Sequence, residues 1–284
     1  MQQIIRVIYL NYTTILLSYM MKNKPFILIS NDDGYHSAGI RALVDMVSNI
    51  ANVIVCAPES ARSGYSCAFT EAFPLRLKRR RNIGEAEVWS CSGTPVDCVK
   101  LALATLCKQR RPDMILAGIN HGDNSSVNTH YSGTMGVAKE GCMKHIPSVA
   151  FSSCYSNADA NLEPLKPFVR FIVQRVLANG LPTGVCLNVN FPASENFRGI
   201  KICRMAFGNW INEIEKAQHP RGYDYYWIAG EHHNDEPDAP QTDRTALTQG
   251  YIAIVPTRID VTAYEYAAHA KALFNAEGSI PTEP

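Results

Sequence analysis

The chain has 284 residues and lacks an excess of charge of either sign, since 27 Lys and Arg residues face 26 Asp and Glu residues. Dedicated nucleic-acid-binding proteins usually carry a basic excess, so this balance argues against that class of function. The nine cysteines form no Cys-x-x-Cys pair, and their odd number does not suit a fully paired disulfide framework. They indicate reduced, mostly buried thiols, and we therefore expect a cytoplasmic protein.

Long apolar runs are also missing from the start of the chain. In the apolar first 20 residues the longest unbroken run is Val7–Leu10, far short of the ~18 residues that a membrane span needs. No small-residue cleavage site of a secretory signal follows. We expect translation to start at Met20 or Met21, with residues 1–20 outside the folded domain; a cryptic signal or anchor is the alternative.

The sequence does contain a repeated order of apolar strands and amphipathic helices. Residues 26–30 read FILIS, a continuous apolar run typical of a buried parallel strand. Apolar residues recur at helical spacing over residues 40–50, and the apolar run of residues 53–57 follows. This order predicts a parallel sheet. The same patterns predict strands at 114–117, 148–152 and 185–191, hairpin strands within 71–92, and helices over 94–106, 132–144 and 162–179.

The pattern changes after residue 191, where strands follow one another without helices between them. We expect strands at 200–207, 223–229 and 251–256, a polar, acidic loop at 231–243 and a last helix at 262–275. The sequence therefore predicts a doubly wound α/β half followed by a β-rich extension. The length fits two domains or one large one, and we favour one domain over residues 21–284, including an extension at about 200–245.

In open parallel sheets, ligands bind beyond the carboxyl ends of the strands. That rule selects stretches of this chain that follow a strand or open a helix. They are residues 31–34, 58–64, 118–124 and 132–134.

The adjacent carboxylates Asp32 and Asp33 lie at one of these strand ends. Their mutual repulsion would be relieved by a hard cation such as Mg²⁺, Mn²⁺ or Ca²⁺. A helix N-cap or turn is the competing interpretation, because Asp-Asp-Gly is frequent in turns. Asn120 is a further oxygen ligand or an Asx-turn residue, and Ser63, taken alone, is a solvated loop hydroxyl.

Ser132, Gly133 and Thr134 open a predicted helix, where backbone N–H groups and the helix dipole favour an anion. Plain capping by one of the two hydroxyls is equally compatible with the pattern. The chain has neither a Walker A motif nor a Gly-x-Gly-x-x-Gly fingerprint, so ATPase and dinucleotide-dehydrogenase chemistry are not indicated.

Other polar clusters are weaker candidates. His232 and His233 precede two acidic residues but match no helix-face metal pair. The basic run of residues 78–81 fits a solvated strand edge better than a substrate-attracting patch. Cys98, Cys107 and Cys142 fall on predicted helices and are expected to fill the core.

Taken in order, these stretches resemble one known family. Residues 27–34, ILISNDDG, are similar to the opening of SurE, the stationary-phase survival nucleotidases. Further similar motifs recur in the family's order between about residues 24 and 275, and residues 1–20 have no counterpart. They are Ala57-Pro58, Arg62-Ser63-Gly64, Gly93-Thr94-Pro95, Gly118-Ile119-Asn120, Ser132-Gly133-Thr134, Leu187-Asn188-Val189-Asn190-x-Pro192, and Thr242-Asp243 through Gly250-Tyr251.

The resemblance implies a Rossmann-like three-layer α/β/α fold with a mostly parallel sheet and a C-terminal β-hairpin extension. It implies a phosphatase that hydrolyses nucleoside 5′-monophosphates, and 3′-monophosphates as a second substrate class. The implied cofactor is one Mg²⁺ or Mn²⁺ per subunit, with Ca²⁺ as another occupant, and the implied assembly is a homodimer or homotetramer that exchanges the extension. No membrane and no obligate nucleic-acid partner is expected.

The resemblance also assigns roles to individual residues. The implied metal ligands are Asp32, Asp33, Ser63 and Asn120, the two aspartates being catalytic as well. The implied phosphate contacts are Ser132, Gly133 and Thr134, and we add Asn31, Gly64 and Asn124 from the same strand-end stretches. Attack by water and an aspartyl-phosphate intermediate both stay open. A non-catalytic nucleotide-binding regulator and a metal-dependent nucleotide or sugar transferase are the alternative functions.

Overall fold

The computed structural model describes residues 24–155 and 160–274. The expected translation start at Met20 or Met21 and the extension of residues 1–20 lie outside the described residues. None of the helices within the described ranges is both long and apolar enough to cross a lipid bilayer.

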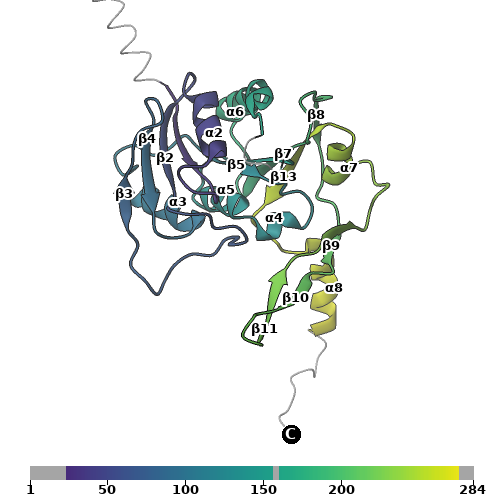
Figure 1. Cartoon of the computed structure of the whole chain (residues 1–284). Helices are drawn as coiled ribbons and strands as arrows, with labels where there is room; N and C mark the ends of the chain where they lie inside the picture. Colours follow the sequence, from purple (N-terminus) through teal and green to yellow (C-terminus); the bar gives the residue numbers. More distant parts are fainter. Residues whose placement is uncertain (1–23, 156–159, 275–284) are drawn as a thin grey trace, which may run out of the picture.

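A nine-stranded sheet forms the centre of the molecule (Figure 1), in the order β3-β4-β2-β1-β5-β6-β7-β13-β8. The strands from β4 to β7 are parallel, whereas β3 is antiparallel to β4 and β13 is antiparallel to β7. Their bounds are β1 Phe26–Ser30, β2 Asn52–Pro58, β3 Leu77–Arg79, β4 Glu87–Cys91, β5 Met114–His121, β6 Ser148–Ser153, β7 Val185–Phe191, β8 Ile200–Ile202 and β13 Ile252–Arg258.

Helices cover both faces of this sheet, as the three-layer prediction requires. On one face α2 (Ala38–Val47) and α6 (Lys166–Asn179), preceded by the 3₁₀ turn η1 (Glu163–Leu165), bury an apolar cluster. On the other face α3 (Pro95–Ala104) and α5 (Gly133–Met143) bury a second cluster that includes several cysteines. The short helices α4 (Asn128–Tyr131) and α7 (Asp243–Thr248) lie near the end of β5 and before β13.

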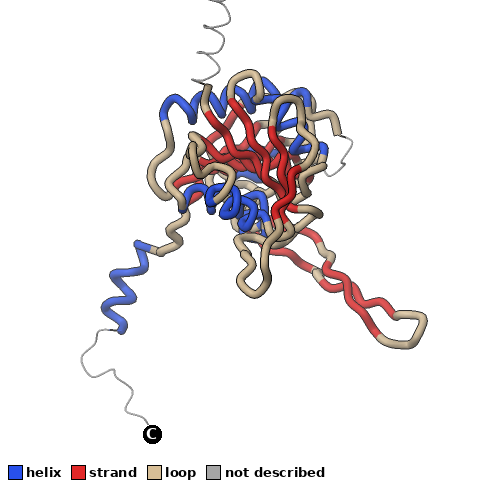
Figure 2. Tube along the Cα trace, turned by 90° about the vertical axis from the view of Figure 1, so that its left-hand side faces the viewer, coloured by secondary structure: helices blue, strands red, loops and turns tan. Residues whose placement is uncertain are grey.

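The extension consists of two antiparallel ribbons. Strands β9 (Gly208–Ile211) and β12 (Glu231–Asn234) pair at its base, and β10 (Ile214–Gln218) pairs with β11 (Asp224–Ile228) at its tip. Figure 2 shows the tip ribbon and the last helix, α8 (Tyr264–Phe274), leaving the body in different directions. No residue of α8 is buried.

Most predicted elements are confirmed, including the strand of residues 26–30 and the helix that Thr94 opens. The structure corrects three details. Residues 231–243 are not simply a polar loop, because β12 forms there, and its polar side chains reflect the exposure of a two-stranded ribbon. The strand expected at 200–207 ends at Ile202, since the chain there turns into the extension. Cys107 lies beyond the end of α3 but is buried as expected.

The order of the sheet places a topological switch point between β1 and β5. From β1 the chain moves outward to β2 and β4, and it then returns to β5 on the other side of β1. The connections that leave β1 and β5 therefore diverge, and the space beyond their carboxyl ends is the usual ligand site of doubly wound sheets.

Candidate metal and phosphate site

The loop after β1 is fixed by its own side chains. The Asn31 amide donates to the Gly34 carbonyl (3.1 Å) and to the Ser37 hydroxyl (2.8 Å), and its Oδ1 accepts from the Gly34 N–H (3.2 Å). Ser37 in turn accepts from the Ile40 N–H (3.3 Å) and caps α2. Asn31 is completely buried, and its hydrogen bonds fix the conformation of the loop that contains the two aspartates.

Asp32 is buried against the start of α5. The Thr134 hydroxyl donates to Asp32 Oδ1 (2.5 Å). A side chain at Gly133 would bring a Cβ within 2.8 Å of the Asp32 Cβ, so a glycine is needed for this close approach. Burial raises the pKa of Asp32 to about 6, against the lowering effect of the Thr134 hydrogen bond, and the neighbouring Asp33 charge raises it further. The carboxylate is therefore costly to ionise unless a cation lies beside it.

Asp33 has a free oxygen in a buried position. Burial raises the pKa of Asp33, and a hydrogen bond from the His121 backbone N–H lowers it in part. Its Oδ2 atom is buried and has no hydrogen-bond partner among the described residues. A buried carboxylate oxygen without a donor is unfavourable by itself, so it fits an atom that a cation would satisfy.

Asn120 lies at the end of β5, the strand next to β1. Its side-chain nitrogen donates to the carbonyls of His121 (3.3 Å) and Gly122 (2.9 Å). These bonds are not an Asx-turn, in which Oδ1 would accept from a backbone N–H, and they leave Oδ1 for another ligand. The structure thus does not contain the suggested Asx-turn at Asn120, and the ligand role of its Oδ1 stays a prediction.

The loop that contains Ser63 is hydrogen-bonded to the loop after β1 and to the end of α4. The Arg62 N–H donates to the Asp32 carbonyl (2.7 Å), and the Ser66 N–H donates to the Tyr131 carbonyl (3.1 Å). Gly136 on α5 allows the close packing of this loop, because a Cβ there would collide with the Ser66 carbonyl oxygen. Ser63 itself is exposed and forms no hydrogen bond with a described residue.

The residues predicted to contact the phosphate differ in their burial and in their hydrogen-bond partners. Ser132 is the N-cap of α5, its Oγ accepting from the Met135 N–H (3.0 Å), whereas the Thr134 hydroxyl points to Asp32. Gly64 lies in the exposed loop in a left-handed conformation. Asn124 is buried, and its amide donates to the Ser152 hydroxyl (2.8 Å), so its side chain holds the loop after β5 against β6. Ser132 therefore caps α5, and anion binding at this helix start stays a prediction.

The donor set fits a hard divalent cation. It consists of two carboxylates, an amide oxygen and a hydroxyl, which are the oxygen ligands that Mg²⁺ and Mn²⁺ prefer. Within residues 24–155 and 160–274 no three His, Cys, Asp or Glu side chains gather as a metal-binding group. In this part of the chain the residues around His232 and His233 therefore form no zinc-type centre, and the oxygen-rich metal site stays a prediction.

His232 and the basic run of residues 78–81, the weaker candidates from the sequence, have hydrogen-bond or ion-pair partners within the fold. His232 Nε2 lies 3.1 Å from the Ser126 hydroxyl, inside the base of the extension. In the basic run, Lys78 and Arg80 both lie 3.3 Å from a Glu59 carboxylate oxygen. The run is therefore an ion-paired edge, as the solvated-edge interpretation predicted.

Sequence reasoning named Asp243 only as part of a family motif and gave no role to this buried carboxylate, which joins three segments. Its oxygens accept from the N–H groups of Ser126 (2.9 Å), Ala206 (3.0 Å) and Arg244 (2.8 Å). Burial raises its pKa, while these hydrogen bonds oppose the shift. Besides that motif, the local signal was Thr242, a helix-capping residue directly before Asp243, and nothing nearby in the sequence indicates the partners more than 30 residues away.

Comparison with known proteins completes the description of the site. Residues 27–212 match the family model described as survival protein SurE. The chain is 51% identical over 245 residues to a protein of Phocaeicola vulgatus named 5′-nucleotidase SurE, covering 86% of this chain and 95% of that protein. It is 45% identical over 248 residues to a Bacteroides thetaiotaomicron protein of the same name, covering 87% and 95%. The crystal structure of a SurE protein from Aquifex aeolicus superposes with a TM-score of 0.75 at 34% identity, covering 88% of this chain and 99% of that one.

Proposed function

The chain belongs to the survival protein SurE family, and from that premise we propose that it is a divalent-metal-dependent 5′-nucleotidase. It hydrolyses nucleoside monophosphates to nucleoside and phosphate. The relatives' names support the substrate class, and the oxygen-rich site at the end of β1 supports the chemistry. We assign it one Mg²⁺ or Mn²⁺ per chain, with Asp32, Asp33, Asn120 and Ser63 as ligands.

One observation carries the metal assignment. Asp33 Oδ2 is buried without a hydrogen-bond donor, next to a second carboxylate whose pKa is raised to about 6. Two adjacent carboxylates in such a position favour a cation between or beside them. When bound, the cation supplies Lewis-acid polarisation of the phosphoryl oxygen and acidifies water.

The chain's own groups perform the remaining tasks. Backbone N–H groups at the start of α5, that of Thr134 included, bind phosphoryl oxygens, and the dipole of α5 stabilises the charge that develops on them. The Thr134 hydroxyl donates to Asp32 and orients that carboxylate. The absence of a side chain at Gly133 lets Asp32 lie against this helix start. Asp33 Oδ2 holds the cation, and the other carboxylate oxygen, which accepts from the His121 N–H, has a second lone pair that orients the attacking water and takes its proton. Asn31, Gly64 and Asn124 shape the loops around the phosphate.

The variant Asp33→Asn tests this assignment. We expect kcat/KM for a nucleoside monophosphate with Mg²⁺ or Mn²⁺ to fall by about 100-fold or more, since a metal ligand and proton acceptor is lost. Asp45→Asn, on the exposed side of α2, is the matched control and should keep full activity. Activity of Asp33→Asn near the wild-type level, with a normal circular dichroism spectrum, contradicts the assignment. A phosphate-release assay without acceptor separates hydrolysis from group transfer.

The β-rich extension is proposed as the assembly element of the single domain formed by residues 21–284. Large apolar side chains on its tip ribbon are exposed, including Trp227 at 63% and Ile228 at 85%. Exposed apolar surface of this extent marks an interface. We propose a homodimer or homotetramer in which the extension is exchanged between subunits. The nine free cysteines support a cytoplasmic location.

A further inference from the structure

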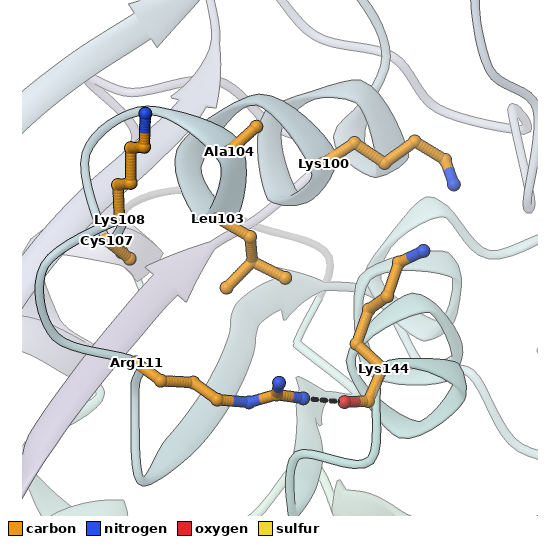
Figure 3. Close-up of a pocket in the computed structure, with 7 residues that line it drawn as sticks. All are labelled: Lys100, Leu103, Ala104, Cys107, Lys108, Arg111 and Lys144. Atoms are coloured by element: carbon orange, nitrogen blue, oxygen red, sulfur yellow. Dashed lines mark hydrogen bonds between the residues drawn. The ribbon is translucent and has the colours of Figure 1, made fainter.

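A basic groove lies between the C-terminal half of α3, the end of α5 and the loop that leads to β5 (Figure 3). Its cavity volume is about 660 Å³. Figure 3 shows cationic side chains around the opening and Leu103 between them. The cations are Lys100, Lys108, Arg111 and Lys144, and the apolar floor includes Leu103 and Cys107.

The positive charges of the groove are only partly balanced. The carboxylate of Glu140, whose side chain is 3% exposed, lies 2.9 Å from Lys100 Nζ and 3.6 Å from Lys144 Nζ. No carboxylate lines the groove, and Lys108 and Arg111 form no ion pair with an acidic side chain in the described part of the chain. Four cations against one carboxylate leave an excess of three positive charges in one cavity.

Capping of helix C-termini accounts for only some of the four cations in the groove. Cations are favourable near helix C-termini, and Arg111 donates to the Lys144 carbonyl at the end of α5. Lys108 lies in the loop beyond α3, and no hydrogen bond joins its ammonium group to a residue described here. Capping therefore leaves Lys108 without a structural role.

We propose that the basic groove is a second ligand site, which binds a small molecule carrying two or more phosphate groups. Several cations in one cavity match the several charges of such a ligand, and ammonium and guanidinium groups are the usual phosphate partners. The cavity has the size of a small-molecule pocket, and the apolar floor offers a surface to an organic moiety. A long polyanion is less suitable, because the chain as a whole has a net charge of only +1.

The basic groove is separate from the candidate metal and phosphate site. Helix α5 begins at Gly133 beside Asp32 and ends at the groove, and α3 runs in the same sense from Thr94 to Ala104. The two helices pack against each other along this path. Because the sites lie at opposite ends of both helices, a ligand in the groove does not compete for Asp32 or Asp33.

Isothermal titration with inorganic tripolyphosphate tests the proposal, in EDTA and at constant ionic strength. We expect saturable binding to the wild type, with affinity reduced about tenfold or more in Lys108→Glu, because an attractive charge becomes a repulsive one. Arg41→Glu, on the exposed surface of α2, changes the net charge equally and should bind like the wild type. Asp33→Asn should also keep its affinity, which separates this result from the proposed nucleotidase activity.

Two results would overturn the proposal. One is unchanged affinity in Lys108→Glu, in a sample whose circular dichroism spectrum shows the wild-type fold. The other is binding of sulfate as tight as that of tripolyphosphate, which is the behaviour of an unspecific cationic surface. A parallel titration with a nucleoside triphosphate identifies the source of the phosphate groups. If the nucleoside triphosphate binds more tightly than tripolyphosphate, the apolar floor contacts the nucleoside. If the two bind equally, the groove recognises the phosphate chain alone.

Discussion

Asp32 illustrates how a residue proposed as a metal ligand can be unfavourable for the metal-free fold. Its carboxyl group is 5% exposed, and burial raises its pKa from 3.8 to about 6. Between these two values the folded chain retains a proton on Asp32 that the unfolded chain has lost. The metal-free protein is therefore stabilised by this group below pH 4, and the contribution disappears as the pH rises through 6.

This linkage predicts the behaviour of Asp32→Asn in EDTA. The variant should lose the decline in stability between pH 4 and 6, and at pH 8 it should melt higher than the wild type by roughly 3 °C or more. Adding Mn²⁺ should reverse the order, because the cation stabilises only the chain that binds it. Thermal unfolding monitored by circular dichroism at several pH values measures both effects. A wild type without that pH-dependent decline would contradict the predicted ionisation.

At the scale of elements, the Asp97 carboxylate at the start of α3 forms hydrogen bonds to two segments of the chain. Asp97 Oδ2 accepts from the Thr94 N–H (2.8 Å), which completes a capping box. The same side chain accepts from the N–H (3.0 Å) and the hydroxyl (2.6 Å) of Thr70. Burial opposes ionisation of Asp97, but these hydrogen bonds prevail and lower its pKa. The cap of α3 thereby also anchors the long loop that carries Ser63.

The variant Asp97→Ala should therefore weaken both segments. We expect the free energy of unfolding to fall by about 1–3 kcal/mol, since a cap and two further hydrogen bonds are lost. Trypsin should cleave the loop at Arg62 and Arg76 faster than in the wild type. Urea denaturation and limited proteolysis measure the two effects, with the exposed Asp45→Ala as control. Cleavage at the wild-type rate would show that the loop is held by other contacts.

Elements with a local signal were predictable, and elements held by distant contacts were not. The FILIS strand, the Thr94 cap and the strand-end position of Asp32 and Asp33 follow from patterns within a few residues. Strand β12 was missed because its sequence, EHHN, is polar on both faces, and only its pairing with β9 makes it a strand. The bond between Thr134 and Asp32 joins residues 102 positions apart, so the sequence could suggest each group but not their contact.

For the whole molecule, the exposed apolar side chains of the tip ribbon concern assembly. The variant Trp227→Asp should shift the protein toward monomers, because a charge in an apolar interface is strongly unfavourable. Sedimentation analysis of wild type and variant measures this shift, and Lys216→Ala on the neighbouring strand is the control. An unchanged sedimentation coefficient would place the interface elsewhere.

The base of the extension has a consequence for how its length can vary. The Arg204 N–H donates to the Gln241 carbonyl and the Asp243 N–H donates to the Arg204 carbonyl, both at 3.0 Å, so residues 205–241 leave and rejoin the body at one point. The free-energy cost of closing such an excursion grows only slowly with its length. Insertions and deletions beyond the β9–β12 ribbon therefore leave the register of β8 and β13 intact. The tip of the extension can thus change in length while the strand end that carries the aspartates stays the same.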